Sequence, residues 1–290
     1  MRRRFTFNTG ETTYHLGITH AHPNVVSGGS PGRIKKIATY LDSPDSKPEI
    51  IESDRGLVTV HGTYNGLAIT CFSTGMGPAS VSITMPEIIE ACDDDDMIFI
   101  RIGTSGGLQQ QLNIGDFVAS TWFQRAESTC DKIMGKGYRA ESDTLVTEAL
   151  VTAALSTKME YQQVYKGPTR VTDDIYFDAL ETKQRASEQP DHNGILAVSM
   201  EGSVYCALRD RYNKDDHRTI HVGELLVISD NVVANDKHID LTQFKKRQPE
   251  IEDTHIRAGL EALVALRRAS IKTPSAKRAM GVRTSDCWDP

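Results

Sequence analysis

Short apolar runs alternate with stretches of helical periodicity along most of this chain. The predicted strands cover residues 22–26, 58–60, 67–73, 97–102, 116–122, 161–166, 195–198 and 223–229. The predicted helices cover residues 31–41, 78–92, 144–155, 200–212 and 252–270, with apolar residues gathered on one face. This alternation predicts an α/β protein: a three-layer α/β/α sandwich with a mixed central sheet between two layers of helices.

The chain is expected to form one domain. No low-complexity linker divides its 290 residues, and its 39% hydrophobic and 25% charged residues are usual for a globular protein. We therefore predict a single domain over residues 1–290. Residues 272–290 are polar and aperiodic, so we expect this C-terminal tail to be poorly ordered unless a partner covers it.

The charge balance argues against nucleic acids and membranes as partners. A formal net charge of −6 gives no general attraction to polyanions, so recognition of a phosphate has to be local. No run approaches the roughly 18 apolar residues of a membrane span. Polar residues 8–13 follow the basic start Met1–Arg4, where a signal peptide would be apolar. Five scattered cysteines without Cys-x-x-Cys spacing are typical of reduced thiols, so we expect a cytoplasmic protein.

Two glycine-rich turns stand next to arginines at the ends of predicted strands: Gly28–Arg33 and Arg101–Gly107. Glycines let backbone N–H groups approach an anion, and a guanidinium group matches phosphate oxygens. Neither turn has the spacing of a P-loop or of a dinucleotide-binding fingerprint, which favours free phosphate or a small phosphorylated ligand. Taken alone, either turn could instead be an ordinary strand-to-loop turn with a surface arginine.

Polar residues stand at two further strand ends, Ser199–Glu201 and Ser229–Asn231. Because ligands of α/β sheets bind outside the carboxyl ends of the strands, we expect both segments near the glycine-rich turns. The run Asp93–Asp96 lies between a predicted helix and a predicted strand and lacks the alternating ligands of a calcium loop. We interpret it as a solvated turn and assign neither a metal nor a cofactor.

Six short motifs follow one another along the chain: Tyr14–Thr19, Gly28–Arg33, Asp54-Arg55, Ser73–Pro78, Arg101–Gly107 and Met200-Glu201. Their order resembles the nucleoside phosphorylase-I family, and most closely its eukaryotic uridine phosphorylases. The resemblance extends over residues 14–270. It implies a twisted central sheet flanked by helices, and a homodimer or higher oligomer whose active sites borrow residues from the neighbouring subunit. The implied substrates are a small-molecule nucleoside and inorganic phosphate.

The resemblance also implies a division of roles among the site residues. Phosphate is held by Gly29, Arg33, Arg101 and Thr104, and by Arg55 from the neighbour; ribose is held by Met200, by Glu201 and by His15 from the neighbour. Cleavage of an N-glycosidic bond by phosphate builds positive charge on the ribose, which suits an anion held below the sugar. Taken singly, His15 could be a surface histidine, Arg55 the partner of Asp54 or Glu52 in a surface ion pair, Met200 a core residue, and Glu201 a helix N-terminal residue.

The segment expected to contact the base departs from the family pattern. Thr172 and Tyr176 fit its aromatic part, but the positions of the usual Gln-x-Arg pair hold other residues, namely Ala179 and Glu181. Gln184 and Arg185 follow a little later, either as replacements for that pair or as part of a helix surface.

Asp230 favours a different base. Purine-specific members of the family place an aspartate at this strand end, where a carboxyl group can protonate or hydrogen-bond the departing base; Asp230 could also only cap the next turn. With Arg101 and Glu201 it completes the predicted catalytic set.

The leading prediction is reversible phosphorolysis of uridine to uracil and ribose 1-phosphate. The alternatives are a purine nucleoside phosphorylase, a nucleosidase, and a catalytically idle relative that binds nucleoside or phosphate; the three arginines disfavour the nucleosidase, which uses water.

Overall fold

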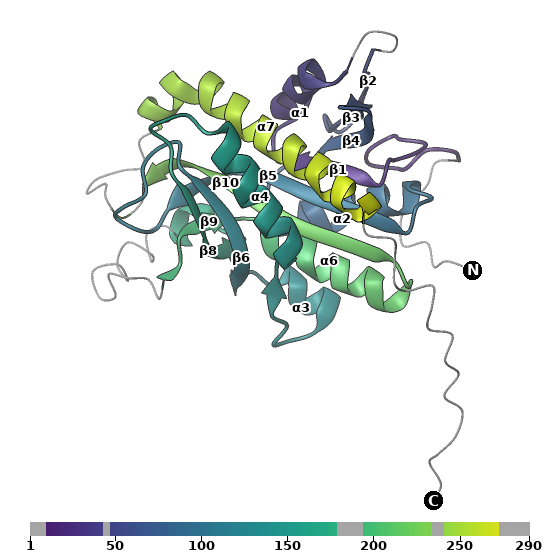
Figure 1. The fold of residues 1–290 in the computed structure, drawn as a ribbon. Helices are drawn as coiled ribbons and strands as arrows, with labels where there is room; N and C mark the ends of the chain where they lie inside the picture. Colours follow the sequence, from purple (N-terminus) through teal and green to yellow (C-terminus); the bar gives the residue numbers. More distant parts are fainter. Residues whose placement is uncertain (1–9, 43–46, 179–193, 232, 234–240, 273–290) are drawn as a thin grey trace, which may run out of the picture.

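The computed structural model describes residues 10–42, 47–178, 194–231, 233 and 241–272 (Figure 1). The strands are β1 Asn24–Gly28, β2 Glu49–Glu52, β3 Val58–Tyr64, β4 Leu67–Ser73, β5 Asp96–Gly107, β6 Phe117–Ala126, β7 Ala140–Glu141, β8 Val164–Thr172, β9 Ala197–Ser199 and β10 Thr219–Asn231. The helices are α1 Pro31–Ile37, the 3-10 turn η1 Ala38–Tyr40, α2 Pro78–Ala91, α3 Thr129–Met134, α4 Thr144–Thr157, α6 Gly202–Asp215 and α7 Thr242–Lys272. Every predicted strand and helix overlaps an observed one, whereas the short elements β2, β7 and α3 were not predicted. The predicted tail lies outside the described residues, apart from Lys272 at the end of α7.

The ten strands form one mixed sheet in the order β10-β6-β8-β9-β5-β1-β4-β3-β2, with β7 beside β6. β1 pairs in parallel with β4 and β5, while β3 pairs antiparallel with β2 and β4. β10 pairs with β5 as well as with β6, so β5, β9, β8, β6 and β10 close into a ring. Strand twist accumulates across a sheet and allows such closure. The mixed sheet is confirmed, and the ring is an addition to the predicted sandwich.

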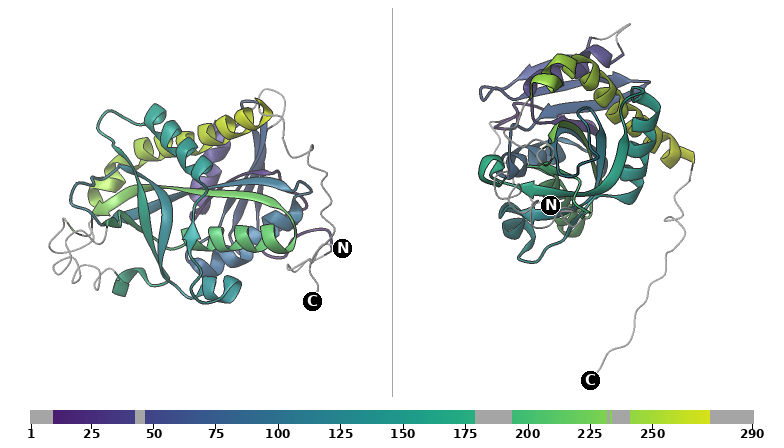
Figure 2. Two further views of the ribbon diagram at one scale, coloured as in Figure 1. Left: turned by 60° about the horizontal axis from the view of Figure 1, so that its bottom comes forward. Right: turned by 90° about the vertical axis from the view of Figure 1, so that its left-hand side faces the viewer.

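Two hydrophobic cores lie on the two faces of the sheet, and β5 contributes to both. Ile98, Ile100 and Ile102 pack in the core that α1, α4 and α7 cover. Met97 and Phe99 pack in the core that α2, α3 and α6 cover. Figure 1 shows α4 and α7 on one side of the sheet and α3 and α6 on the other, and the left view of Figure 2 shows strands between the two layers. A strand buried on both faces needs apolar residues at consecutive positions, which explains the unbroken run at residues 97–100.

The carboxyl ends of four strands meet at one edge of the sheet. β1, β4, β5 and β10 are linked by parallel pairs, so they run in the same direction. β9 runs antiparallel to the last residues of β5 and brings Ser199 back beside them. At Ser229 a bulge shifts the register of β10, so Ile228 pairs with Ser105 and Asp230 with Gly106. The polar segments at the strand ends therefore gather as expected.

Other predicted features also have a place in the fold. The run Asp93–Asp96 is exposed between α2 and β5. The free cysteines in the described ranges are Cys71, Cys92, Cys130 and Cys206, and all are buried; Cys287 lies outside those ranges. In the described part of the chain, no helix is both long and apolar enough to cross a membrane.

Asp143, the residue before α4, ties this helix to α6 and β10. Its carboxylate accepts hydrogen bonds from the Val222 N–H at 3.2 Å and from Arg209 Nη1 at 3.0 Å, and lies 2.9 Å from His221 Nδ1. Burial acts to raise the pKa of Asp143, but the bond to His221 and the charge of Arg209 outweigh it and lower that pKa. The same bond raises the pKa of His221 above its ordinary value of 6.5.

We predict that replacing His221 with glutamine costs most stability in mildly acidic solution. Because the pKa of His221 is higher in the folded state than in the unfolded state, protonated His221 stabilises the fold at pH values below the unfolded-state pKa. This stabilisation is lost as pH rises through the folded-state pKa. The stabilising contribution of Asp143 is lost as pH falls through its lowered pKa. The contributions of Asp143 and His221 are therefore both present between pH 3.8 and pH 6.5, the ordinary pKa values of the two groups. Urea unfolding should therefore show the largest difference between wild type and His221→Gln in that window, and a smaller one at about pH 9. A difference that is the same at every pH would contradict the assignment.

Candidate active site

A cavity of about 690 Å³ opens where the strand ends meet. Residues from β5, β9 and β10, from the turns after β1, β4 and β9, and from α1 line it. Eight of the predicted site residues are among them: Gly29, Arg33, Arg101, Thr104, Tyr176, Met200, Glu201 and Asp230. The fold thus brings into one place residues as far apart in the sequence as Gly29 and Asp230.

Arg33 lies at the start of α1 and is only 8% exposed. Its guanidinium group donates to the Ile102 carbonyl at 3.1 Å and to Thr104 Oγ1 at 2.6 Å, and its Nε donates to Glu252 of α7 at 3.1 Å. Burial lowers the pKa of Arg33, and the Glu252 carboxylate opposes that effect. The cation is therefore held firmly beside the exposed Thr104 hydroxyl, where an anion can reach both groups.

Arg101, on β5, is 4% exposed and lies between two carboxylates. Its Nη1 donates to Glu224 at 2.9 Å, and its Nη2 forms an ion pair with Glu201. Its Nε is buried and has no hydrogen-bond partner among the described residues. Burial acts to lower the pKa of Arg101, but Glu201 and Glu224 outweigh it. Two carboxylates therefore share one guanidinium group, and an anion that binds Arg101 has to compete with Glu201.

The Glu224 carboxylate is the deeper of these two acids. It accepts hydrogen bonds from Ser199 Oγ at 3.0 Å and Ser120 Oγ at 2.7 Å. Burial raises its pKa, and the charge of Arg101 opposes the rise. Glu224 was not among the predicted site residues, although it is a charged side chain inside the apolar run 223–229, which could have marked it.

Glu201 occupies the N-cap position of α6, directly after β9. Its Oε1 accepts a hydrogen bond at 2.9 Å from the N–H of Gly77, the residue before α2. The backbone N–H of Glu201 donates to Ser199 Oγ at 3.2 Å. Gly77 has φ +90°, a conformation that favours glycine and turns its N–H toward the carboxylate. Met200, which precedes Glu201, lines the cavity and supplies an adaptable apolar contact.

The predicted base-contacting residues are only partly brought together. Asp230 is 2% exposed at the wall of the cavity, and Tyr176 is 76% exposed at its mouth. Thr172 is not among the lining residues; its hydroxyl lies 3.2 Å from both the N–H and the carbonyl of Asp174. Gln184 and Arg185 lie outside the described residues.

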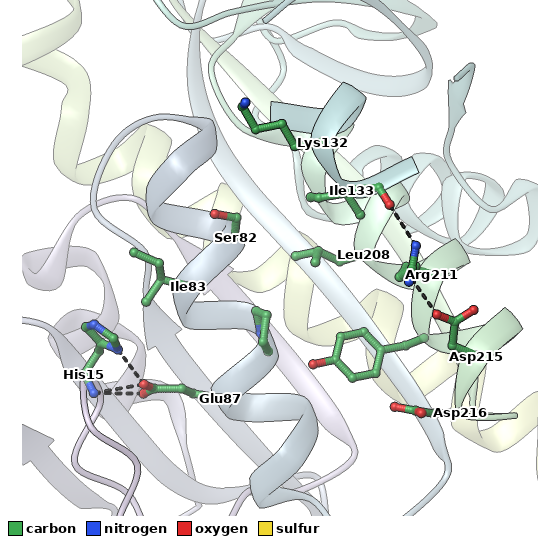
Figure 3. A pocket seen from close by; sticks show the side chains of 12 residues that line it. His15, Ser82, Ile83, Glu87, Lys132, Ile133, Leu208, Arg211, Asp215 and Asp216 are labelled. Atoms are coloured by element: carbon green, nitrogen blue, oxygen red, sulfur yellow. Dashed lines mark hydrogen bonds and ion pairs between the residues drawn. The ribbon is translucent and has the colours of Figure 1, made fainter. Parts of the chain in front are cut away.

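His15 and Arg55 lie away from this cavity. His15 Nδ1 is 2.6 Å from Glu87 Oε1. Both residues line a separate pocket of about 340 Å³ (Figure 3). Figure 3 shows His15 turned toward Glu87, with Arg211 and Asp215 across the pocket. Arg55 is exposed, with its guanidinium carbon 5.4 Å from the centre of the Tyr14 ring. Neither residue contributes to the cavity of its own chain.

Comparison with known proteins identifies the family. Residues 23–265 match the Phosphorylase superfamily. A guanosine phosphorylase of Halorubrum lacusprofundi is 29% identical over 247 residues, 84% of this chain and 94% of that protein. A uridine phosphorylase of Haemophilus influenzae is 31% identical over 167 residues, 56% of this chain and 62% of that protein. The structure of a Toxoplasma gondii purine nucleoside phosphorylase with immucillin-H has the same fold, with a TM-score of 0.73 at 20% identity, over 91% of this chain and 99% of that one.

The chain therefore belongs to the nucleoside phosphorylase family, whose enzymes are pentosyltransferases, and the family resemblance predicted from its motifs is confirmed. A nucleoside and phosphate are the substrates that fit this family. The relatives divide between purine and pyrimidine nucleosides, so the family alone does not define the base.

We predict that Gly103→Ala impairs phosphate binding by displacing Arg101. A Cβ atom at Gly103 would overlap the Arg101 guanidinium and lie 2.7 Å from Leu226 Cδ2. Loss of a charge-assisted contact worth roughly 1.5–3 kcal/mol should weaken phosphate binding about 10- to 100-fold, measured by calorimetric titration.

The matched control is Gly62→Ala on β3. There a Cβ atom would lie 2.7 Å from Leu41 Cδ1, so the variant carries a similar side-chain overlap at a residue that does not line the cavity. We expect some loss of stability in Gly62→Ala but unchanged phosphate affinity. Equal phosphate affinity in Gly103→Ala and wild type would show that Arg101 does not hold the anion.

Proposed function

We propose that this protein is a uridine phosphorylase, which converts uridine and inorganic phosphate reversibly into uracil and ribose 1-phosphate. The observation that carries the proposal is the pairing, in one cavity, of two buried arginines with a buried carboxylate: Arg33 and Arg101 beside Glu201. The preference for uridine rests on the motif series, which resembles that of the eukaryotic uridine phosphorylases. The uridine phosphorylase relative supports the same substrate.

In this proposal phosphate binds beside the two arginines of the cavity. Arg33, Thr104 and the backbone of Gly29 surround it, and Arg101 turns from Glu201 toward its oxygens. When Arg101 turns, its ion pair with Glu201 is exchanged for one with phosphate, while Glu224 continues to hold the far side of the guanidinium group. Phosphate binding thereby frees a Glu201 oxygen for the sugar.

Glu201 and Met200 position the ribose above the phosphate. The ionised carboxylate is an acceptor only, which suits the adjacent sugar hydroxyl groups. An oxygen of hydrogenphosphate forms a bond to C1′ as the bond from C1′ to N1 breaks. The electron pair of the broken bond leaves with uracil, and the proton that hydrogenphosphate gives up balances the one that uracil gains. Positioning of both reactants and stabilisation of the separating charges account for the rate, without a covalent enzyme intermediate.

A purine nucleoside is the second candidate substrate, favoured by Asp230. This carboxyl group is buried at the cavity wall on β10. A carboxyl group beside the departing base can supply the proton that a purine ring accepts. The guanosine phosphorylase relative, which matches along most of the chain, points to the same alternative.

The complete site is proposed to need two subunits. In one chain, the exposed Arg55 and the partly buried His15 stay outside the cavity. In a homodimer Arg55 would reach the phosphate of the neighbouring site, and His15 the 5′-hydroxyl of its ribose. The hydrogen bond of 2.6 Å between His15 Nδ1 and Glu87 Oε1 would then fix the orientation of the imidazole ring.

The substrate is tested by incubating purified protein with phosphate and, separately, uridine, thymidine, inosine, adenosine and methylthioadenosine. We expect ribose 1-phosphate from uridine, and no cleavage after exhaustive removal of phosphate. Asp230→Asn should then change turnover of uridine little, but it should strongly reduce turnover of a purine. Cleavage of purine nucleosides alone would reject the uridine assignment, and cleavage at full rate without phosphate would indicate a nucleosidase.

The shared site is tested by mixing two inactive or weakened variants. Arg55→Ala removes one charge-assisted phosphate contact and should weaken phosphate use about 10- to 100-fold. Subunit exchange with Arg101→Ala should restore activity, because one of the two sites in a mixed dimer has both arginines. Mixtures that stay as weak as the separate variants, although exchange is verified by mass spectrometry, would show that Arg55 does not serve the neighbouring site.

A further inference from the structure

Three histidines converge at the end of β1 that lies opposite the cavity. His20 and His22 precede this strand, and His61 lies on β3. One side-chain nitrogen from each can be chosen so that all three lie within 4.8 Å of one another. The rings of His20 and His61 are stacked, with centroids 4.5 Å apart, and the ring of His22 meets that of His61 edge-on at 5.7 Å.

The buried member of this trio has a ring nitrogen without a hydrogen bond. His61 is 4% exposed, and its Nε2 has no hydrogen-bond partner among the described residues. Its other nitrogen, Nδ1, lies 3.0 Å from Thr70 Oγ1, on the paired residue of β4. A buried polar atom without a partner is costly, so it calls for a ligand.

The Thr70 hydroxyl can hold His61 in the tautomer that a metal ion requires. Its hydroxyl oxygen accepts the His22 N–H at 2.7 Å and can accept His61 Nδ1–H with its second lone pair. With the proton on Nδ1, His61 Nε2 carries a free lone pair. Metal-binding histidines are commonly oriented in this way, by a hydrogen bond from the second ring nitrogen.

We propose that His20, His22 and His61 bind one divalent transition-metal ion of the zinc type. Three imidazoles suit zinc, nickel or copper, whereas magnesium and calcium prefer oxygen ligands. Zinc commonly takes four ligands in a tetrahedron, and the exposed side of His20 leaves the fourth position to water. The neutral form of imidazole is the form that binds a metal ion.

Metal binding requires only a small closing movement. Zinc–nitrogen bonds of about 2.0–2.1 Å in a tetrahedron place the nitrogens about 3.3–3.4 Å apart. Nitrogens within 4.8 Å of each other therefore have to approach by at most about 1.5 Å. His20 is exposed and His22 half-buried, so rotation of these side chains provides that movement around the fixed His61.

Such an ion would crosslink the segment before β1 to the sheet. The segment that carries His15 continues through His20 and His22 into β1, and the ion would tie it to β3. The site lies away from the phosphate end of the sheet, so its role is structural and does not depend on the proposed reaction. The sequence did not suggest it, because the pairing of β4 with both β1 and β3 is what brings His61 to the other two histidines.

The test uses the full-length chain without a polyhistidine tag, stripped of metal with a chelator. Calorimetric titration with Zn²⁺ should give one ion per chain with micromolar or tighter affinity, and the melting temperature should rise with Zn²⁺. His20→Asn should weaken binding about 100-fold or more and abolish the rise in melting temperature. Thr70→Val, which keeps all three imidazoles, should weaken binding about 10- to 100-fold.

The matched control is His217→Asn. His217 is also exposed, and its φ of 56° is one that asparagine tolerates. This variant should bind Zn²⁺ as the wild type does. Circular dichroism before titration checks that each variant is folded, and His20→Asn, at an exposed position, keeps the test valid if Thr70→Val does not fold. Absence of binding to the wild type at micromolar Zn²⁺, or equal affinity of wild type and His20→Asn, would overturn the proposal.

Discussion

The buried guanidinium group of Arg101 is the constraint on which the rest of the site depends. A cation that is 4% exposed is stable only with charged partners close by, and here these are Glu201 and Glu224. Glu201 arrives from the turn between β9 and α6, and Glu224 from β10, so β5 must pair with both neighbouring strands. Closure of the strand ring is thus the means by which three distant charges meet. Glycine at position 103 leaves the room that the side chain of Arg101 occupies.

In the proposed reaction, this arrangement also connects phosphate binding to ribose binding. Glu201 neutralises Arg101 in the free enzyme, and both groups are needed by different substrates in the proposed reaction. In the proposed reaction, entry of phosphate would replace one anionic partner of Arg101 with another, which limits the desolvation cost of bringing a charged nucleophile into the cavity. Arg33 differs, because its partners Glu252, Ile102 and Thr104 hold it in place before any ligand arrives. Arg33 is therefore preorganised, whereas in the proposed mechanism Arg101 responds to the ligand.

Local sequence signals predicted the elements of the fold and most of the cavity wall, because these features depend on neighbouring residues. The apolar run at residues 97–100 marks a doubly covered strand, and Gly28–Arg33 marks a strand-to-helix turn. Pairings between distant segments could not be predicted in this way: β5 with β10, Arg33 with Glu252, and His61 with His20. The short helix α3 has 6 residues, fewer than two turns, so an apolar repeat cannot be recognised in it. The proposal that His15 and Arg55 serve a neighbouring site rests on the motif series, since in one chain both lie outside the cavity.

The most direct test of this account is a crystal structure of the protein with phosphate and uridine. We predict phosphate oxygens within hydrogen-bond distance of Arg33, Arg101 and Thr104, with Arg101 turned from Glu201 and still paired with Glu224. The Glu201 carboxylate should accept hydrogen bonds from the ribose hydroxyl groups, with the uracil ring between Tyr176 and β10. Phosphate bound outside this cavity, or Arg101 still paired with Glu201 while both ligands are present, would contradict the account.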